Sequence, residues 1–252
     1  MAIFFVTEAV KILIIQRGER MIKVVLFDLD GTLLPMEAEK FAKCYFSSIA
    51  ARLSQFGYDP NAIVQMIWAG TKAMIKNDGA QTNEAVFWNT AAQMMGEGIR
   101  AEEPRFNLFY IEDFDKVQAS CGYNEAAAKA VREIKGKGYR VALATNPIFP
   151  AIATQKRIRW AGLSTDDFEL VTTYENSRHC KPNLDYYKDI MAQLGVCGEE
   201  CLMVGNDVGE DMIAEKLGMK VFLITDCMIN RAGADISVYP HGSFEELLDF
   251  LK

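Results

Sequence analysis

Two aspartates separated by one residue, Asp28 and Asp30, are the first side chains in this sequence whose spacing indicates chemistry. They follow the apolar run 24–27, which has the length and β-branching of a strand buried in a parallel sheet. Residues two apart in an extended chain point to the same side, so both carboxylates can reach one small volume. Because ligands of open α/β sheets bind at the carboxyl ends of strands, we expect a site there. Gly31 then lets the chain turn through backbone torsions that other residues resist.

Three further polar clusters occur later in the chain, at or just past the expected ends of strands. They comprise Thr145 with Asn146, then Lys181, and finally Asn206 with Asp207 and Asp211. A doubly wound sheet brings the carboxyl ends of its strands to one edge, so these side chains should gather around Asp28. Pro182 restricts the preceding residue to an extended conformation, which would help to aim the Lys181 ammonium group.

The elements that must position these residues alternate between strands and helices, which predicts an α/β fold with a doubly wound parallel sheet. The expected strands are residues 24–27, 139–144, 168–172, 201–204 and 220–224, and the expected helices are residues 125–135, 150–160, 184–194, 210–217 and 244–251. Residues 36–121 show helical spacing of apolar side chains and no convincing strand, so we expect an inserted helical domain. The α/β core then comprises residues 21–35 and 122–252, and residues 1–20 form an N-terminal extension of unknown role.

The order and context of the polar clusters resemble the four motifs of the haloacid dehalogenase-like hydrolase superfamily. In chain order the motifs are Asp28-x-Asp30-Gly-Thr, the strand that ends in Thr145, Lys181-Pro182, and Gly-Asn-Asp207-x-x-x-Asp211. The resemblance covers the chain from Met21 to its end, and the helical insert resembles the helical cap of the phosphoglycolate phosphatase-like class. It implies a Rossmann-like core and a phosphohydrolase that acts on a small phosphorylated metabolite.

By this resemblance, Asp28 is the nucleophile, and an aspartyl-phosphate intermediate divides one difficult step into two easier steps. Asp30 resembles the general acid/base, which protonates the leaving alkoxide and later deprotonates the hydrolytic water. As an acid it must hold a proton near neutral pH, which neighbouring negative charge favours. The family binds its metal through the first aspartate, the backbone carbonyl of the second and an acidic residue of the fourth motif. The implied metal ligands are therefore Asp28, Asp30 and Asp207.

The cofactor implied is Mg²⁺, and the charge of the site supports it. At ~4 Å and an effective dielectric constant of about 20, each pair of like charges costs on the order of 4 kcal/mol. A phosphate that approaches four aspartates would be repelled several times over, unless a hard divalent cation with oxygen ligands intervenes. The whole chain has two histidines and no Cys-x-x-Cys pair, which argues against a metal centre built on histidine or thiolate.

The remaining motif residues have supporting roles. Thr145 and Asn146 offer a hydroxyl and an amide to phosphate oxygens, and Lys181 offsets the charge that develops in the transition state. Asp211 either binds the metal through water or orients the lysine. Asn206 departs from the commonest form of the motif, in which aspartate follows the glycine directly, so the fourth-motif ligand is either Asp207 or the amide oxygen of Asn206.

Composition restricts the partners and the compartment. The formal net charge of −7 gives no general support for binding to nucleic acid or to an anionic membrane. The apolar stretch 2–15 is interrupted by Glu8 and Lys11, and it is too short and too charged to span a membrane. Six scattered cysteines suit a reducing cytoplasm. We therefore expect a cytoplasmic enzyme with a small-molecule substrate, and the sequence carries no indication of the oligomeric state.

Three alternative functions remain open. A sugar phosphomutase of the same fold would use the same aspartate pair, but such enzymes carry a histidine and basic residues soon after the first motif, and residues 33–36 contain none. Haloacid dehalogenases lack the second aspartate because carbon–halogen cleavage needs no acid for the leaving group, so Asp30 argues against them. A binding protein with a silent site is the least supported, because every motif residue is present.

The insert is rich in aromatic residues and methionine. Its large apolar side chains include Trp68, Met74, Phe87, Trp88, Met94 and Met95. We expect most of them to form the core of the insert, because large apolar side chains at helical spacing usually pack against neighbouring helices. One or two of them, or Lys72, Lys76 or Arg105, could instead line a substrate pocket.

Overall fold

The structure, a computed structural model, describes residues 21–252 and contains a five-stranded parallel sheet with the strand order β2-β1-β3-β4-β5. The strands are β1 (Val24–Phe27), β2 (Arg140–Leu143), β3 (Cys201–Gly205), β4 (Lys220–Ile224) and β5 (His241–Gly242). The chain moves from β1 to β2 on one side and then returns to β3 on the other side, so the direction of winding switches at β1. The expected α/β fold with a parallel sheet is confirmed, whereas the extension predicted at residues 1–20 lies outside the described residues.

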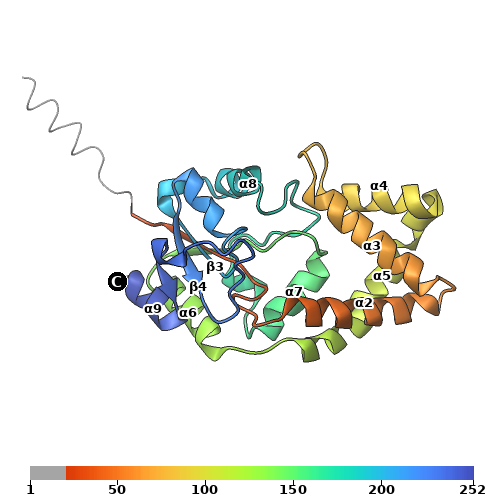
Figure 1. The fold of residues 1–252 in the computed structure, drawn as a ribbon, viewed down its shortest axis with the longest axis horizontal. Coiled ribbons are helices and arrows are strands. Elements are labelled where there is room, and N and C mark those ends of the chain that lie inside the picture. Colours follow the sequence, from red (N-terminus) through yellow and green to blue (C-terminus); the bar gives the residue numbers. More distant parts are fainter. Residues whose placement is uncertain (1–20) are drawn as a thin grey trace, which may run out of the picture.

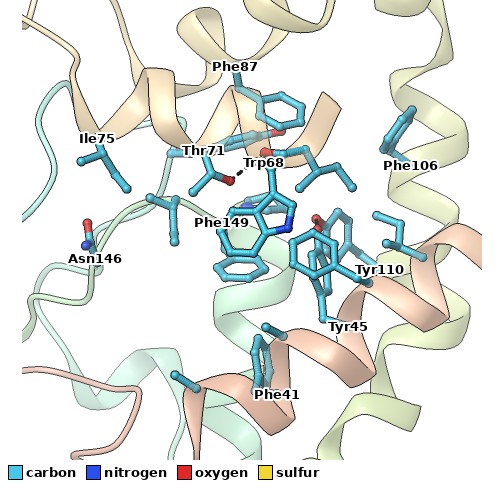
Figure 2. Close-up of a pocket in the computed structure, with 18 of the residues that line it drawn as sticks. Phe41, Tyr45, Trp68, Thr71, Ile75, Phe87, Phe106, Tyr110, Asn146 and Phe149 are labelled. Carbon is cyan, nitrogen blue, oxygen red and sulfur yellow. Dashed lines mark hydrogen bonds between the residues drawn. The ribbon is translucent and has the colours of Figure 1, made fainter. Parts of the chain in front are cut away.

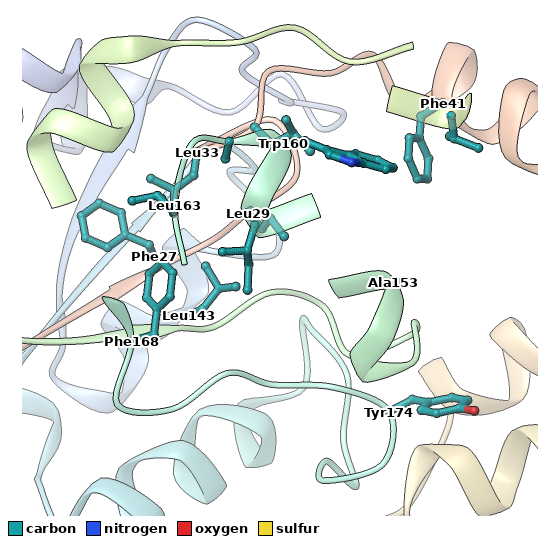
Figure 3. Close-up of a cluster of buried hydrophobic side chains, with 14 of the residues drawn as sticks. Phe27, Leu29, Leu33, Phe41, Leu143, Ala153, Trp160, Leu163, Phe168 and Tyr174 are labelled. Carbon is teal, nitrogen blue, oxygen red and sulfur yellow. The ribbon is translucent and has the colours of Figure 1, made fainter. Parts of the chain in front are cut away.

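Helices cover both faces of this sheet (Figure 1). They are α6 (Glu125–Gly136), α7 (Ala151–Trp160), α8 (Leu184–Leu194), α9 (Phe244–Phe250) and the short 3-10 helices η4 (Thr165–Asp167), η5 (Gly198–Glu200), η6 (Met212–Leu217) and η7 (Ile236–Val238). Alternate residues of β1 face opposite layers, as the pleat of a strand requires. Val25 and Phe27 pack in one buried cluster with residues of α6, α7 and α9, and Val24 and Leu26 pack in another with α8 and η6. Figure 3 shows the first cluster, where Phe27 lies beside Leu143 of the neighbouring strand.

Between β1 and α6 the described elements are all helical. They are α2 (Ala38–Ser54), α3 (Pro60–Ile75), α4 (Asn83–Met95), η1 (Glu97–Glu102), α5 (Glu103–Leu108), the π-helix η2 (Phe109–Asp113) and the 3-10 helix η3 (Phe114–Ser120). We call this segment the helical insert. Asp59 and Thr82 cap α3 and α4 by accepting hydrogen bonds from backbone N–H groups in the first turn. Within residues 21–252, no helix combines the length and the apolar content that a membrane span requires.

Besides their shared hydrophobic cluster and the hydrogen bonds from Lys156 and Trp160 of α7 to η2 and η3, the insert contacts the α/β body through its two connecting segments and through the start of α4. The two connecting segments lie side by side, because Met36 and Cys121 form an antiparallel bridge. The start of α4 forms the second contact, where the side-chain amide of Asn83 donates to the carbonyl of Pro147 at 3.1 Å and its backbone N–H donates to the carbonyl of Ser177 at 2.8 Å. Asn83 is fully buried there, so the insert is held against the body by polar contacts that exclude water.

Two of the expected elements are wrong in detail. Residues 168–172 form no regular strand, and Val171 meets Leu143 in an isolated parallel bridge. The chain leaves the edge of the sheet after this bridge, because the Thr172 hydroxyl turns inward and donates to the carbonyl of Thr145 at 2.7 Å. The helix expected at residues 210–217 is shorter, since it begins at Met212 as a 3-10 helix after Asp211. The strand β5 was not expected, and it consists of two residues only.

Candidate active site

The site is built around Asp28, the first residue after β1. Its backbone N–H donates to the carbonyl of Val204 at 2.9 Å, so it extends the ladder between β1 and β3. The ammonium group of Lys181 donates to Oδ1 of Asp28 at 2.9 Å and to Oδ1 of Asp211 at 2.6 Å. Lys181 is 1% exposed, so these two carboxylates are its charge partners in a nearly dry environment. Asp211 thus contacts the lysine directly, and its two predicted roles, metal binding through water and orientation of the lysine, stay predictions.

Burial and charge oppose each other in this cluster. Burial acts to lower the pKa of Lys181, but the carboxylates of Asp211 and Asp28 together raise it well above its usual range. Burial raises the pKa of Asp211 to about 6, although the lysine acts in the opposite direction. Lys181 consequently keeps its charge at neutral pH, and it holds a fixed cation beside the carboxylate of Asp28.

A threonine hydroxyl connects Asp28 with the fourth motif. Oγ1 of Thr32 lies 3.1 Å from Oδ2 of Asp28 and 3.0 Å from Oδ1 of Asn206, and its single proton serves one of them at a time. The Asn206 amide nitrogen donates to the carbonyl of Cys227 at 2.6 Å, which fixes its oxygen toward the Asp28 side. Gly31 has a φ of 86°, and a Cβ there would lie 2.3 Å from this amide nitrogen. Glycine is therefore required both by the turn and by the approach of Asn206.

The carboxylate of Asp207 pairs with Arg231, and not with the lysine that binds Asp28 and Asp211. Its Oδ1 accepts hydrogen bonds from the backbone N–H groups of Gly209 and Glu210, at 2.8 and 3.0 Å. Its Oδ2 lies 2.8 Å from Nη1 of Arg231, whose side chain is 69% exposed. Within the described residues, no group of three or more acidic, histidine or cysteine side chains is arranged to hold a metal ion. The expected magnesium site, and the choice between Asp207 and Asn206 as its ligand, therefore stay predictions.

Asp30 forms a partly buried ion pair that the sequence analysis did not predict. Oδ2 of Asp30 is bound by Nη1 of Arg157, and the Arg157 side chain is fully buried with its guanidinium carbon 4.4 Å from the centre of the Phe149 ring. Oδ1 of Asp30 is also buried, and it has no hydrogen-bond partner among the described residues. Burial raises the pKa of Asp30, although Arg157 acts in the opposite direction. The only signal for Arg157 in the sequence is its four-residue spacing from Ala153, on the buried face of α7, and from Ala161, directly after this helix.

Thr145 and Asn146 follow β2, and both carry buried polar atoms that nothing in the described chain satisfies. The carbonyl of Thr145 accepts hydrogen bonds from Thr172 and from Tyr186, which fix the backbone. The Thr145 hydroxyl and Oδ1 of Asn146 are buried and have no partner within residues 21–252. Buried polar atoms are hydrogen-bonded in about nine of ten cases or more. Unpartnered atoms on neighbouring strand ends, next to an anchored lysine, are what a site for a polar ligand requires.

A cavity of about 360 Å³ lies between the helical insert and the α/β body and borders the site at Asn146, as Figure 2 shows. The body contributes Asn146, Glu210 and Arg231 to its lining. The Asn146 amide donates to Oε2 of Glu210 at 3.1 Å, and burial raises the pKa of Glu210 to about 7. Neither Glu210 nor Arg231 was singled out from the sequence, because each reads as an ordinary charged residue of a loop. The insert supplies the opposite wall, and Lys72, Lys76 and Arg105 are not part of it.

Comparison with known proteins shows what the chain is similar to. The family model described as haloacid dehalogenase-like hydrolase matches residues 22–217. A phosphoglycolate phosphatase of Colwellia psychrerythraea is 26% identical over 235 residues, which cover 91% of this chain and 97% of the relative. A ribulose-1,5-bisphosphate 5-phosphatase of Halopiger xanaduensis is 25% identical over 218 residues, which cover 81% of this chain and 84% of the relative. Among solved structures, a 2-haloacid dehalogenase of Pseudomonas syringae shares the fold with a TM-score of 0.62 at 17% identity, covering 92% of this chain and 98% of the other.

Proposed function

Because the chain belongs to the haloacid dehalogenase-like hydrolase family, we propose that it is a Mg²⁺-dependent phosphatase that cleaves a small phosphorylated metabolite. Two of the relatives described above bear the names of phosphatases, which supports this choice of reaction. The observation that carries the proposal is the set of unpartnered buried atoms, Oδ1 of Asp30 and Oγ1 of Thr145, beside the Lys181–Asp28 ion pair. A phosphoryl group at this place would receive a hydrogen bond, a positive charge and a proton from the chain.

In the first step, a carboxylate oxygen of Asp28 attacks phosphorus while the bond from phosphorus to the leaving oxygen breaks. Oδ1 of Asp28 accepts one hydrogen bond, from Lys181, and Oδ2 accepts at most one, from Thr32, so each oxygen keeps a lone pair for the attack. Asp30 transfers its proton to the leaving oxygen, which departs as an alcohol. Lys181 and the Thr145 hydroxyl offset the negative charge on the phosphoryl oxygens.

In the second step, Asp30 is a carboxylate and acts as the base. It takes a proton from a water molecule whose oxygen attacks phosphorus, and the bond from phosphorus to Asp28 breaks to release inorganic phosphate. Asp30 must therefore be stable in both protonation states. Burial favours its protonated form, and the ion pair with Arg157 favours its charged form, so the two effects keep both states accessible.

The donors at this edge fit a magnesium ion, since they are hard oxygen atoms rather than thiolates or imidazoles. We assign the Asp28 carboxylate, the Asp30 backbone carbonyl and the Asp207 carboxylate as ligands. Asp207 is buried, and its charge partner is the largely exposed Arg231, so the carboxylate can exchange this partner for a metal at little structural cost. When bound, the cation neutralises the negative charge shared by the phosphate and the aspartates.

Two further parts of the proposal concern the alternatives and the compartment. Similarity to a dehalogenase at 17% identity concerns the fold alone, and fold does not determine the reaction. The presence of Asp30 as the second aspartate of the first motif favours phosphate chemistry, because a phosphate ester needs an acid for its leaving group. The six cysteines are scattered along the chain and include no Cys-x-x-Cys pair, and we place the enzyme in the cytoplasm on this ground.

The proposal is tested by hydrolysis of 4-nitrophenyl phosphate with Mg²⁺ and with excess EDTA, at pH values from 5 to 9. We expect metal-dependent turnover in the wild type, and its loss in Asp28→Asn. The exposed Asp185→Asn at the start of α8 is the matched control and should keep full activity. Mass spectrometry after acid quenching should find the phosphoryl group on Asp28. Absence of metal-dependent turnover over the whole pH range would refute the proposal.

A further inference from the structure

The cavity that borders Asn146 is lined largely by aromatic rings. Figure 2 shows Phe41, Tyr45, Trp68 and Phe149 around one cavity, with the first three contributed by the insert. The ring centres of Tyr45 and Phe149 lie 5.3 Å apart at an interplanar angle of 76°, so these two rings support each other edge to face. Their packing gives the cavity a preformed, rigid base next to Asn146.

Unlike Tyr45, Trp68 is not buried, because its side chain is 45% exposed. Its indole contacts Phe46 on one side, with ring centres 5.0 Å apart, and borders the cavity. Ile75, on the same helix two turns later, is also 45% exposed and also lines the cavity. Large apolar side chains of one helix that are left half-exposed beside an open cavity gain free energy when an apolar group covers them.

The charges of the cavity are confined to its body side. Glu210 and Arg231 are the charged residues in its lining, and the described residues that the insert contributes are all uncharged. The Tyr45 and Tyr110 hydroxyls, 2.8 Å apart, satisfy each other, and burial raises the pKa of Tyr45 to about 12, so they remain neutral. A carboxylate or a second phosphate on the leaving group would lose its hydration against this wall and find no cation there.

We propose that the cavity binds the leaving group of the substrate, and that this group is an uncharged aromatic alcohol. The inference rests on the proposed phosphatase function, since the phosphoryl group must lie at Asp28 for the rest of the ester to reach this cavity. Its volume of about 360 Å³ lies in the range of roughly 300–1,000 Å³ that small-molecule sites occupy. The reaction is ordinary hydrolysis, in which ester and water give the aromatic alcohol and inorganic phosphate.

The test compares esters whose leaving groups have similar basicity, so that the aromatic ring is the main difference between them. We would measure kcat/KM for 2-phenylethyl phosphate, ethyl phosphate and phosphoglycolate with the wild type. We expect 2-phenylethyl phosphate to exceed ethyl phosphate by about 10- to 100-fold, the gain that burial of one apolar ring gives. Phosphoglycolate should be the poorest substrate, because its carboxylate has no partner on the insert side.

Two variants test the wall itself. Trp68→Ala should lower the ratio of 2-phenylethyl to ethyl phosphate at least fivefold, whereas Phe56→Ala, which removes a similarly exposed ring outside the cavity, should leave it unchanged. Ile75→Lys places a cation in the cavity from a half-exposed position, so folding should tolerate it, and it should raise phosphoglycolate turnover relative to 2-phenylethyl phosphate.

The measurements distinguish failure of the aromatic leaving group from failure of the proposed phosphatase function. If ethyl phosphate and phosphoglycolate are hydrolysed with dependence on Asp28, but 2-phenylethyl phosphate is not preferred, the phosphatase stands and the aromatic leaving group is wrong. A preference that survives Trp68→Ala unchanged would likewise overturn the assignment of the cavity. If no phosphate ester is turned over at all, the proposed function fails first.

Discussion

Replacing Lys181 with methionine tests the central ion pair more directly than any loss of activity could. The substitution keeps most of the apolar stem but removes the ammonium group that lies 2.9 Å from Asp28 and 2.6 Å from Asp211. Two carboxylates then face each other at a buried position without a cation. We expect the variant to fold with a lower free energy of unfolding, and we expect the loss to depend on pH.

The magnitude follows from the distances and the burial. At about 2.8 Å and an effective dielectric constant of about 20, each charge pair is worth roughly 6 kcal/mol before the cost of desolvation is subtracted. Desolvation of a 1% exposed lysine cancels much of this, and removal of one partner from a buried pair usually costs about 3–5 kcal/mol. We therefore expect Lys181→Met to lose about 3–5 kcal/mol at pH 8.

The pH dependence has a definite sign. Burial already raises the pKa of Asp211 to about 6 in the wild type, and without the lysine it must rise further. A carboxyl group with a raised folded-state pKa costs no stability when it is protonated in both states. The cost grows as the pH rises from the unfolded-state pKa of about 3.9 to the folded-state pKa, and it is constant above that. The difference between wild type and Lys181→Met should therefore be smallest near pH 5 and larger at pH 8.

Urea denaturation at pH 5 and pH 8 provides the assay. Adding Asp211→Asn to Lys181→Met should recover about 1–2 kcal/mol at pH 8, because it removes one of the two unpaired charges. Lys188→Met, which breaks an exposed ion pair with Asp185, is the control and should cost less than about 0.5 kcal/mol. A loss below about 1 kcal/mol in Lys181→Met, or a loss independent of pH, would refute the account of this buried cluster.

Three further predictions concern other residues. Asp30→Asn should lower kcat/KM, which reports the first step alone, by about 10²- to 10⁴-fold for an alkyl phosphate, and by much less for 4-nitrophenyl phosphate, whose leaving group needs no proton; equal losses in kcat/KM would contradict its role as an acid. Burial raises the pKa of Glu210 to about 7, so the wild type should lose stability as the pH rises from about 5 to 8. In thermal melts, Glu210→Gln should therefore be as stable as the wild type at pH 5 and more stable than the wild type at pH 8. Asn83→Ala should lower the free energy of unfolding in urea by about 1–3 kcal/mol, because the buried carbonyl of Pro147 loses its donor; an unchanged midpoint would argue against this contact.

The sequence alone determined those strands and helix ends that depend only on residues close to each other in the chain. The run Val24–Phe27 is a strand with the predicted bounds, because four apolar residues in a row suit a position covered on both faces. The caps at Asp59 and Thr82 are local in the same way, since each bonds to a residue three positions later. Residues 168–172 mislead, because their composition favours a strand while their place at the sheet edge provides one bridge.

The sequence by itself therefore determined the alternation of strands and helices, and the order of the polar clusters at the strand ends. Only the tertiary structure decided which charges pair: Arg157 with Asp30, Arg231 with Asp207, and Lys181 with both Asp28 and Asp211. The same holds for the aromatic cavity, whose lining comes from both the insert and the body. The physical reason is that backbone periodicity and capping act over a few residues, whereas burial and ion pairing depend on which distant segments the sheet and the insert bring together.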